Sequence, residues 1–118
     1  MKICEIKDLL GADVLCGEEL LEHDVASACC SDMMSDVLAY VKDQGVLVTG
    51  LVNPQVIRTA NMMDMVCIVF VRGKTPDEAI IKLAADKGIV LMKSEERMFT
   101  ACGLLYSNGL KGGCIEDV

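Results

Sequence analysis

The chain has 118 residues, which is enough for one domain with its own hydrophobic core but leaves no room for a second. It is 53% hydrophobic but only 3% aromatic, which argues against a surface that stacks the bases of single-stranded nucleic acid. The net charge of −7 argues against nucleic acid in general, because an acidic chain repels the phosphate backbone.

The excess of acid is confined to residues 1–41, which carry nine acidic and two basic side chains, so an anion can still bind to the remainder. No apolar run approaches the roughly 20 residues of a membrane-spanning helix, and the first five residues lack the pattern of a signal peptide. We therefore expect a cytoplasmic protein without a membrane partner.

Short apolar runs occupy the first 30 residues. Ile6, Leu9 and Leu10 predict a short helix that ends at Gly11. Residues 14–16 and 25–30 predict two strands, separated by a charged turn at 17–19. These strands begin the sheet.

A helical spacing of apolar residues follows between residues 31 and 45. Ser31 or Asp32 is the expected N-cap, and Gly45 the expected end. Asp32 and Asp36 would then share one helix face, where carboxylates more often stabilise the positive end of the helix than bind a cation. The apolar positions are Met34, Val37, Leu38 and Val41.

The middle of the chain alternates buried strands with helices. Residues 46–49 predict a buried strand, and Asn53 followed by Pro54 predicts the start of a helix, with Asn as the cap. Residues 66–71 are uninterrupted apolar sequence, so their strand must be covered on both sides and lie in the centre of the sheet.

The last third continues the alternation. Thr75 and Glu78 have the spacing of a capping box at the start of a helix that ends at Lys87 and Gly88. Residues 89–92 predict another strand, and Ser94 is the expected cap of a last helix that ends at Asn108 and Gly109.

In residues 46–106, predicted strands therefore alternate with predicted helices, which predicts parallel strands with right-handed crossovers. We expect a three-layer α/β/α fold with a mostly parallel sheet, made mixed by the N-terminal strands. The expected domain spans residues 1–118, with a core at about 6–110 and a flexible tail at 111–118.

Three of the predicted loops follow strand ends and precede helices, which is where open parallel sheets bind ligands and where free helix N–H groups favour an anion. The same loops are needed as connectors whether or not a ligand binds. A phosphate-binding P-loop is not expected, because Gly73-Lys74-Thr75 lacks the upstream glycine and Pro76 removes an amide. The candidate ligand-binding residues are Thr49, Gly50, Asn53, Gln55, Arg58, Arg72, Gly73, Lys74, Lys93 and Ser94.

No catalytic, metal or cofactor site is expected. The single histidine, His23, has no cysteine or histidine at ligand spacing, and the seven cysteines contain no Cys-x-x-Cys pair. Most of the cysteines should be small buried hydrophobic residues, with Cys114 the most reactive. Cys29 and Cys30 are adjacent, so on a strand they would point to opposite faces.

The pattern over residues 6–110 resembles the DRTGG domain family. The resemblance rests on residues 31–38, Val48-Thr49-Gly50, residues 69–73, Thr75-Pro76-Asp77, residues 88–91, and Phe99, Gly103, Leu105 and Tyr106 near the end. The two loops that give the family its name differ here, and read Gly50-Leu51-Val52-Asn53-Pro54-Gln55 and Val71-Arg72-Gly73-Lys74.

This resemblance implies a fold like the N-terminal domain of HPr kinase/phosphorylase and an accessory role. Such domains accompany CBS domains in a regulated pyrophosphatase, beside an adenine-nucleotide sensor and a dimer interface, and they occur in phosphate acetyltransferase-like proteins. Some stand-alone members are encoded near hydrogenase and ferredoxin components, which implies a redox-related partner.

We therefore expect a non-catalytic regulatory or interaction domain, homodimeric, that binds a small anion such as an adenine nucleotide at the strand-end loops. Met62, Met63 and Met65 could supply a dimer or protein-partner face, although at least two of them should pack in the core. The alternative is a redox- or metal-linked accessory protein that acts with an electron-transfer partner. Its candidate cysteines are Cys29, Cys30, Cys102 and Cys114.

Overall fold

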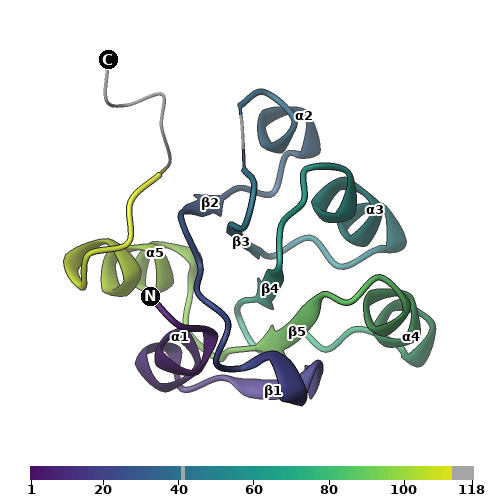
Figure 1. Ribbon diagram of the computed structural model, residues 1–118, viewed down its shortest axis with the longest axis horizontal. Helices are drawn as coiled ribbons and strands as arrows, with labels where there is room; N and C mark the ends of the chain where they lie inside the picture. The colour runs from purple at the N-terminus through teal and green to yellow at the C-terminus, as the bar shows by residue number, and fades with distance from the viewer. Residues whose placement is uncertain (41, 113–118) are drawn as a thin grey trace.

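A five-stranded sheet with helices on both faces forms the centre of the computed structural model, which describes residues 1–40 and 42–112 (Figure 1). The elements are α1 (Ile3–Leu10), β1 (Asp13–Cys16), the 3₁₀ turn η1 (Glu18–Leu20), β2 (Ala28–Cys30), α2 (Met34–Val37), β3 (Val46–Thr49), α3 (Pro54–Met62), β4 (Cys67–Phe70), α4 (Glu78–Asp86), β5 (Val90–Lys93) and α5 (Met98–Ser107).

The strand order is β1-β5-β4-β3-β2. Strands β2 to β5 pair in parallel, and β1 pairs with β5 in the antiparallel direction. The predicted three-layer fold with a mostly parallel, mixed sheet is confirmed. The prediction of a central, doubly covered strand is also confirmed, because every residue of β4 is fully buried and β4 is the middle strand.

The two faces of the sheet hold two separate hydrophobic cores. Figure 1 shows α1 and α5 on one face and α2, α3 and α4 on the other. Because side chains alternate along a strand, Val69 of β4 packs with α1 and α5, whereas Ile68 and Phe70 pack with α3 and α4. The long apolar run of β4 is thus divided between both cores.

Several predicted boundaries are confirmed. Gly11 ends α1 in the left-handed conformation, at φ 57°, and Asn53 caps α3 by accepting a hydrogen bond from Val56 N at 3.2 Å. Asn108 follows the last residue of α5. In the described part of the chain, no helix is long and apolar enough to cross a membrane.

The predicted helix between residues 31 and 45 is wrong in length and in its cap. Helix α2 has only four residues, and its N-cap is Met33. Ser31 Oγ instead accepts a hydrogen bond from Met33 N at 3.0 Å, and the Asp32 carboxylate bonds to the loop after β3. Because Asp32 precedes the helix, it shares no helix face with Asp36, and Val41 lies outside the described residues.

Two other predicted caps are also wrong. Asp77, rather than Thr75, caps α4 and accepts a hydrogen bond from Ile80 N at 3.0 Å, as fits the stronger capping preference of Asp. Ser94 does not cap α5, because its buried hydroxyl donates to Leu10 O at 2.6 Å and so satisfies a carbonyl at the end of α1.

Strand β2 is shorter than predicted. Val25 is buried, but its N–H donates to Met1 O at 2.7 Å, and the next amide, Ala26 N, donates to Gln44 O at 2.9 Å. Pairing with β3 therefore begins only at Ala28, whose N–H donates to Lys111 O on its other side at 2.8 Å. Of the predicted tail at 111–118, residues 113–118, with Cys114, lie outside the described residues.

Candidate functional site

The loop after β3 holds a carboxylate of the protein itself. Asp32 Oδ1 accepts hydrogen bonds from Gly50 N at 2.6 Å and from Thr49 Oγ1 at 3.2 Å. Thr49 Oγ1 in turn accepts from Leu51 N at 3.1 Å. Two of the groups that were predicted to bind an anion, on Thr49 and Gly50, therefore bind the carboxylate of Asp32 within the protein itself.

Arg72 completes this arrangement from the loop after β4. Its Nη2 lies 3.6 Å from Asp32 Oδ2, and both side chains are about half exposed, at 43% for Arg72 and 50% for Asp32. The guanidinium also lies so close to Gly50 that a Cβ there would collide with it. We call Asp32, Thr49, Gly50 and Arg72 the Asp32 cluster.

The backbone of the β4 loop is held in an unusual conformation. Arg72 has φ 62°, in the left-handed region that bulky residues rarely adopt, and Gly73 follows at φ 67°. Arg72 N donates to Glu96 O at 2.7 Å, and Gly73 N donates to Ser94 O at 2.9 Å. These two bonds fix the β4 loop against the β5 loop. The amides of Arg72 and Gly73 are therefore already hydrogen-bonded within the protein.

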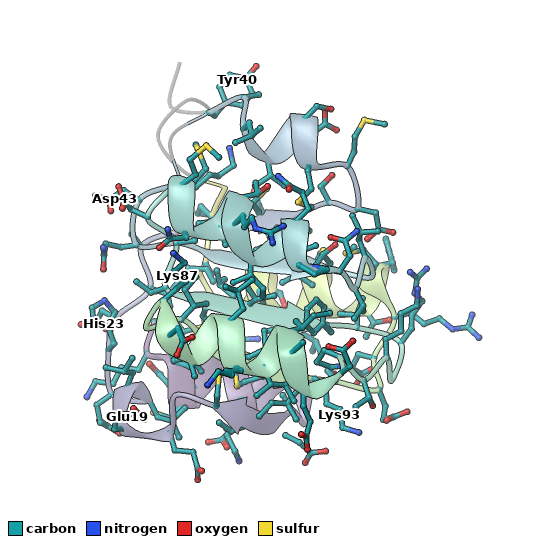
Figure 2. All side chains as sticks on the ribbon, turned by 90° about the vertical axis from the view of Figure 1, so that its right-hand side faces the viewer. Glu19, His23, Tyr40, Asp43, Lys87 and Lys93 are labelled. Atoms are coloured by element: carbon teal, nitrogen blue, oxygen red, sulfur yellow. The ribbon has the colours of Figure 1, made fainter. Side chains whose placement is uncertain are left out.

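The remaining candidate residues do not gather around Asp32. Asn53 is used as the cap of α3, and the Gln55 amide donates along the same helix to Thr59 Oγ1 at 3.4 Å. Arg58 is exposed on α3, and Lys74 is exposed in the β4 loop. Lys93 Nζ donates to Thr75 Oγ1 at 3.3 Å, so it is engaged with the loop before α4. Figure 2 shows Lys93 and Lys87, the C-cap of α4, on different sides of the molecule.

A hollow of about 590 Å³ lies beside Arg72, and we call it the arginine hollow. Its lining contains two guanidinium groups, one carboxylate and one aromatic ring. These residues are Arg72, Glu95, Arg97, Met98 and Phe99. The Phe99 side chain, in the first turn of α5, is 89% exposed.

Sequence reasoning missed Asp32, Arg97 and Phe99 as members of this region. Arg97 had a usable signal, because it is a cation in a strand-to-helix loop, between β5 and α5. Asp32 had none, since its contact with Gly50 depends on β2 lying next to β3. The exposure of Phe99 depends on how α5 lies on the sheet.

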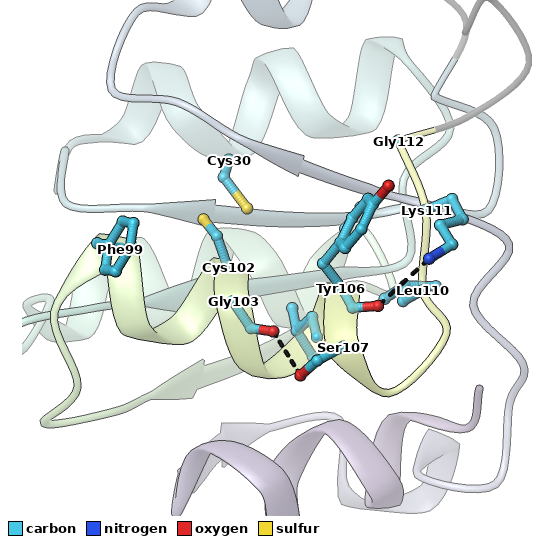
Figure 3. A pocket seen from close by; sticks show the side chains of 11 residues that line it. Cys30, Phe99, Cys102, Gly103, Tyr106, Ser107, Leu110, Lys111 and Gly112 are labelled. Carbon is cyan, nitrogen blue, oxygen red and sulfur yellow. Dashed lines mark hydrogen bonds between the residues drawn. The ribbon is translucent and has the colours of Figure 1, made fainter.

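The cysteines divide between the two faces of β2, as the strand geometry predicted. Cys29 packs with the core formed by α2, α3 and α4, whereas Cys30 faces α5. Cys102 of α5 points toward Cys30 in Figure 3. Cys67 is fully buried, and this burial raises the pKa of its thiol.

The sequence profile of the DRTGG domain matches residues 5–107, which is most of the chain. The chain belongs to the DRTGG domain family. This confirms the resemblance noted in the sequence. No curated protein matches this DRTGG domain significantly.

A solved structure has the same fold. It is the crystal structure of the CBS and DRTGG domains of the regulatory region of Clostridium perfringens pyrophosphatase, in complex with its activator diadenosine tetraphosphate. The TM-score is 0.70 at 18% sequence identity. The match covers 88% of the present chain but only 45% of the pyrophosphatase chain, so it covers less than half of that regulatory region.

Proposed function

We propose that this DRTGG domain is a non-catalytic regulatory domain that binds an adenine nucleotide or a similar small anion at the carboxyl edge of its sheet. The supporting observation is that Arg72, Arg97 and Phe99 line one hollow, at the end of β4 and β5. Two guanidinium groups suit the oxygens of a phosphate, and an exposed ring suits the face of a base. The solved relative carries an adenine dinucleotide as its activator.

The charge of the region favours an anion by a small margin. Arg72 and Arg97 bring two positive charges to the arginine hollow, and Glu95 brings one negative charge. Lys74 is exposed in the same loop as Arg72 and adds a further cation to that loop. Asp32 competes for Arg72, since their atoms lie 3.6 Å apart. A phosphate therefore binds Arg72 in competition with the protein's own carboxylate.

Isothermal titration calorimetry tests this proposal with ADP, ATP and diadenosine tetraphosphate, and with adenosine and pyrophosphate as fragments. We expect binding that Arg97→Ala and Phe99→Ala both weaken. Lys87→Ala is the matched control, because Lys87 is the C-cap of α4 and precedes β5, whereas Arg97 follows the carboxyl end of β5. Absence of binding by all five compounds, or equal losses in the control, would overturn the proposal.

The proposal includes a homodimer in the cytoplasm. Met62 is 64% exposed, whereas Met63 is half-buried and Met65 is buried, so one of the three methionines is available for a partner. The described cysteines are all free thiols, as is usual in a reducing compartment. Sedimentation velocity of wild type and Met62→Glu tests the dimer. A monomer at every concentration of the wild-type protein would remove it from the proposal.

A further inference from the structure

A second site lies between α5 and the edge strand β2, and Phe99 lines both this site and the arginine hollow. It is a groove of about 680 Å³, and we call it the cysteine groove. Cys30, the last residue of β2, and Cys102, in the second turn of α5, both line it. Figure 3 shows their sulfur atoms directed toward each other across the groove.

The two thiols differ in acidity because each one shifts the pKa of the other. The neighbouring Cys30 thiol lowers the pKa of Cys102. Cys102 in turn raises the pKa of Cys30. Cys102 is therefore the better nucleophile, because the thiolate is the reactive form of cysteine, and Cys30 is placed to resolve whatever Cys102 forms.

The groove is accessible to a small molecule. Cys30 is exposed, and the rings of Phe99 and Tyr106 are exposed on the same wall of α5. Lys111 also lines the groove, with Nζ 3.8 Å from the centre of the Tyr106 ring. A compound with an alkyl disulfide and a carboxylate would find both an apolar wall and a cation here.

We propose that Cys30 and Cys102 form a redox-active dithiol that exchanges with low-molecular-weight disulfides of the glutathione type. The Cys102 thiolate attacks one sulfur of the disulfide, forms a mixed disulfide and releases the first thiolate. The Cys30 thiol then loses its proton and attacks Cys102 Sγ, which forms the Cys30–Cys102 disulfide and releases the second thiolate. The protein loses two electrons and two protons, and one small disulfide becomes two thiols.

The experiment treats the reduced protein with oxidised glutathione, blocks remaining thiols with iodoacetamide, and maps cysteines by mass spectrometry. All variants carry Cys114→Ser, which removes the thiol of the C-terminal tail from the comparison. We expect one intramolecular disulfide between Cys30 and Cys102, reversed by dithiothreitol. Cys30→Ser should instead hold one glutathione on Cys102, and Cys102→Ser should lose the intramolecular disulfide.

Cys29→Ser is the matched control, since Cys29 is the strand neighbour of Cys30 but packs on the opposite face. It should form the disulfide as the parent does. Melting curves of all variants show that they are folded, and the glutathione adduct of Cys30→Ser provides a readout that does not need Cys102 to be changed. Absence of the Cys30–Cys102 disulfide, or an adduct of Cys30→Ser that is spread over several cysteines, would overturn the proposal.

Discussion

Replacing Arg72 by glycine should separate the role of its side chain from the strain of its backbone. Arg72 adopts φ 62°, where a residue with a Cβ is disfavoured and glycine is not. Arg72→Gly and Arg72→Ala both remove the guanidinium and its ion pair with Asp32. That pair is about half exposed and contributes about 0–1 kcal/mol. Both variants lack the guanidinium, so both lose this contribution equally.

The difference between the two variants then comes from the backbone. Alanine in a left-handed conformation destabilises a protein by about 1 kcal/mol relative to glycine. A chain of 118 residues has an unfolding entropy of about 0.25 kcal/mol/K, so 1 kcal/mol corresponds to about 4 °C. Arg72→Gly should therefore melt about 4 °C above Arg72→Ala, although both should bind anions more weakly than the wild type.

Arg58 offers a control of opposite sign. It is exposed in the middle of α3, where glycine is less favourable than alanine by about 1 kcal/mol. Differential scanning calorimetry of the four variants should show glycine as the more stable residue at position 72 and alanine as the more stable at position 58. If Arg72→Ala melts at or above Arg72→Gly, the backbone of the β4 loop is not strained as described.

Three further changes test the two sites. Asp32→Asn keeps the acceptor for Gly50 N but removes the charge that competes for Arg72, so anion affinity measured by calorimetry should rise about tenfold, and an unchanged affinity would exclude the competition. Gly50→Ala should leave the fold intact, because the colliding atom is the end of a flexible side chain, but weaken anion binding by displacing Arg72. Normal binding in that variant would place the anion away from Gly50. Cys30→Ala removes the thiol that lowers the pKa of Cys102, so the pH midpoint for alkylation of Cys102 should rise and its rate at pH 7 should fall. An unchanged midpoint would show that Cys30 does not lower the pKa of Cys102.

The fold could be predicted from sequence where one residue type had one physical use. The continuous apolar run of β4 required cover on both sides, and Asn53 before Pro54 required a helix start. Prediction failed where a polar side chain had two uses. Ser94 could cap a helix, but it satisfies the end of α1, which is distant in sequence and becomes a neighbour only after folding.

The candidate site was less predictable because its contacts cross between elements. The loops after β3 and β4 were expected to lie together, and Arg72 does lie against Gly50. Asp32 joins them because β2 is the edge strand next to β3. The Cys30–Cys102 pair likewise requires both the strand order and the placement of α5 on that face. Neither follows from spacing along the chain.

The two sites share Phe99, and one short segment also joins them. Only Ser31 separates Cys30, in the cysteine groove, from Asp32, whose carboxylate holds Gly50 and Arg72. A Cys30–Cys102 disulfide would tie the end of β2 to α5, so the position of Asp32 should depend on the oxidation state. By thermodynamic linkage, any change that oxidation makes to anion affinity must appear as an equal effect of the anion on oxidation. The glutathione equilibrium measured with and without nucleotide therefore tests whether anion binding and oxidation of the two cysteines are coupled in this DRTGG domain.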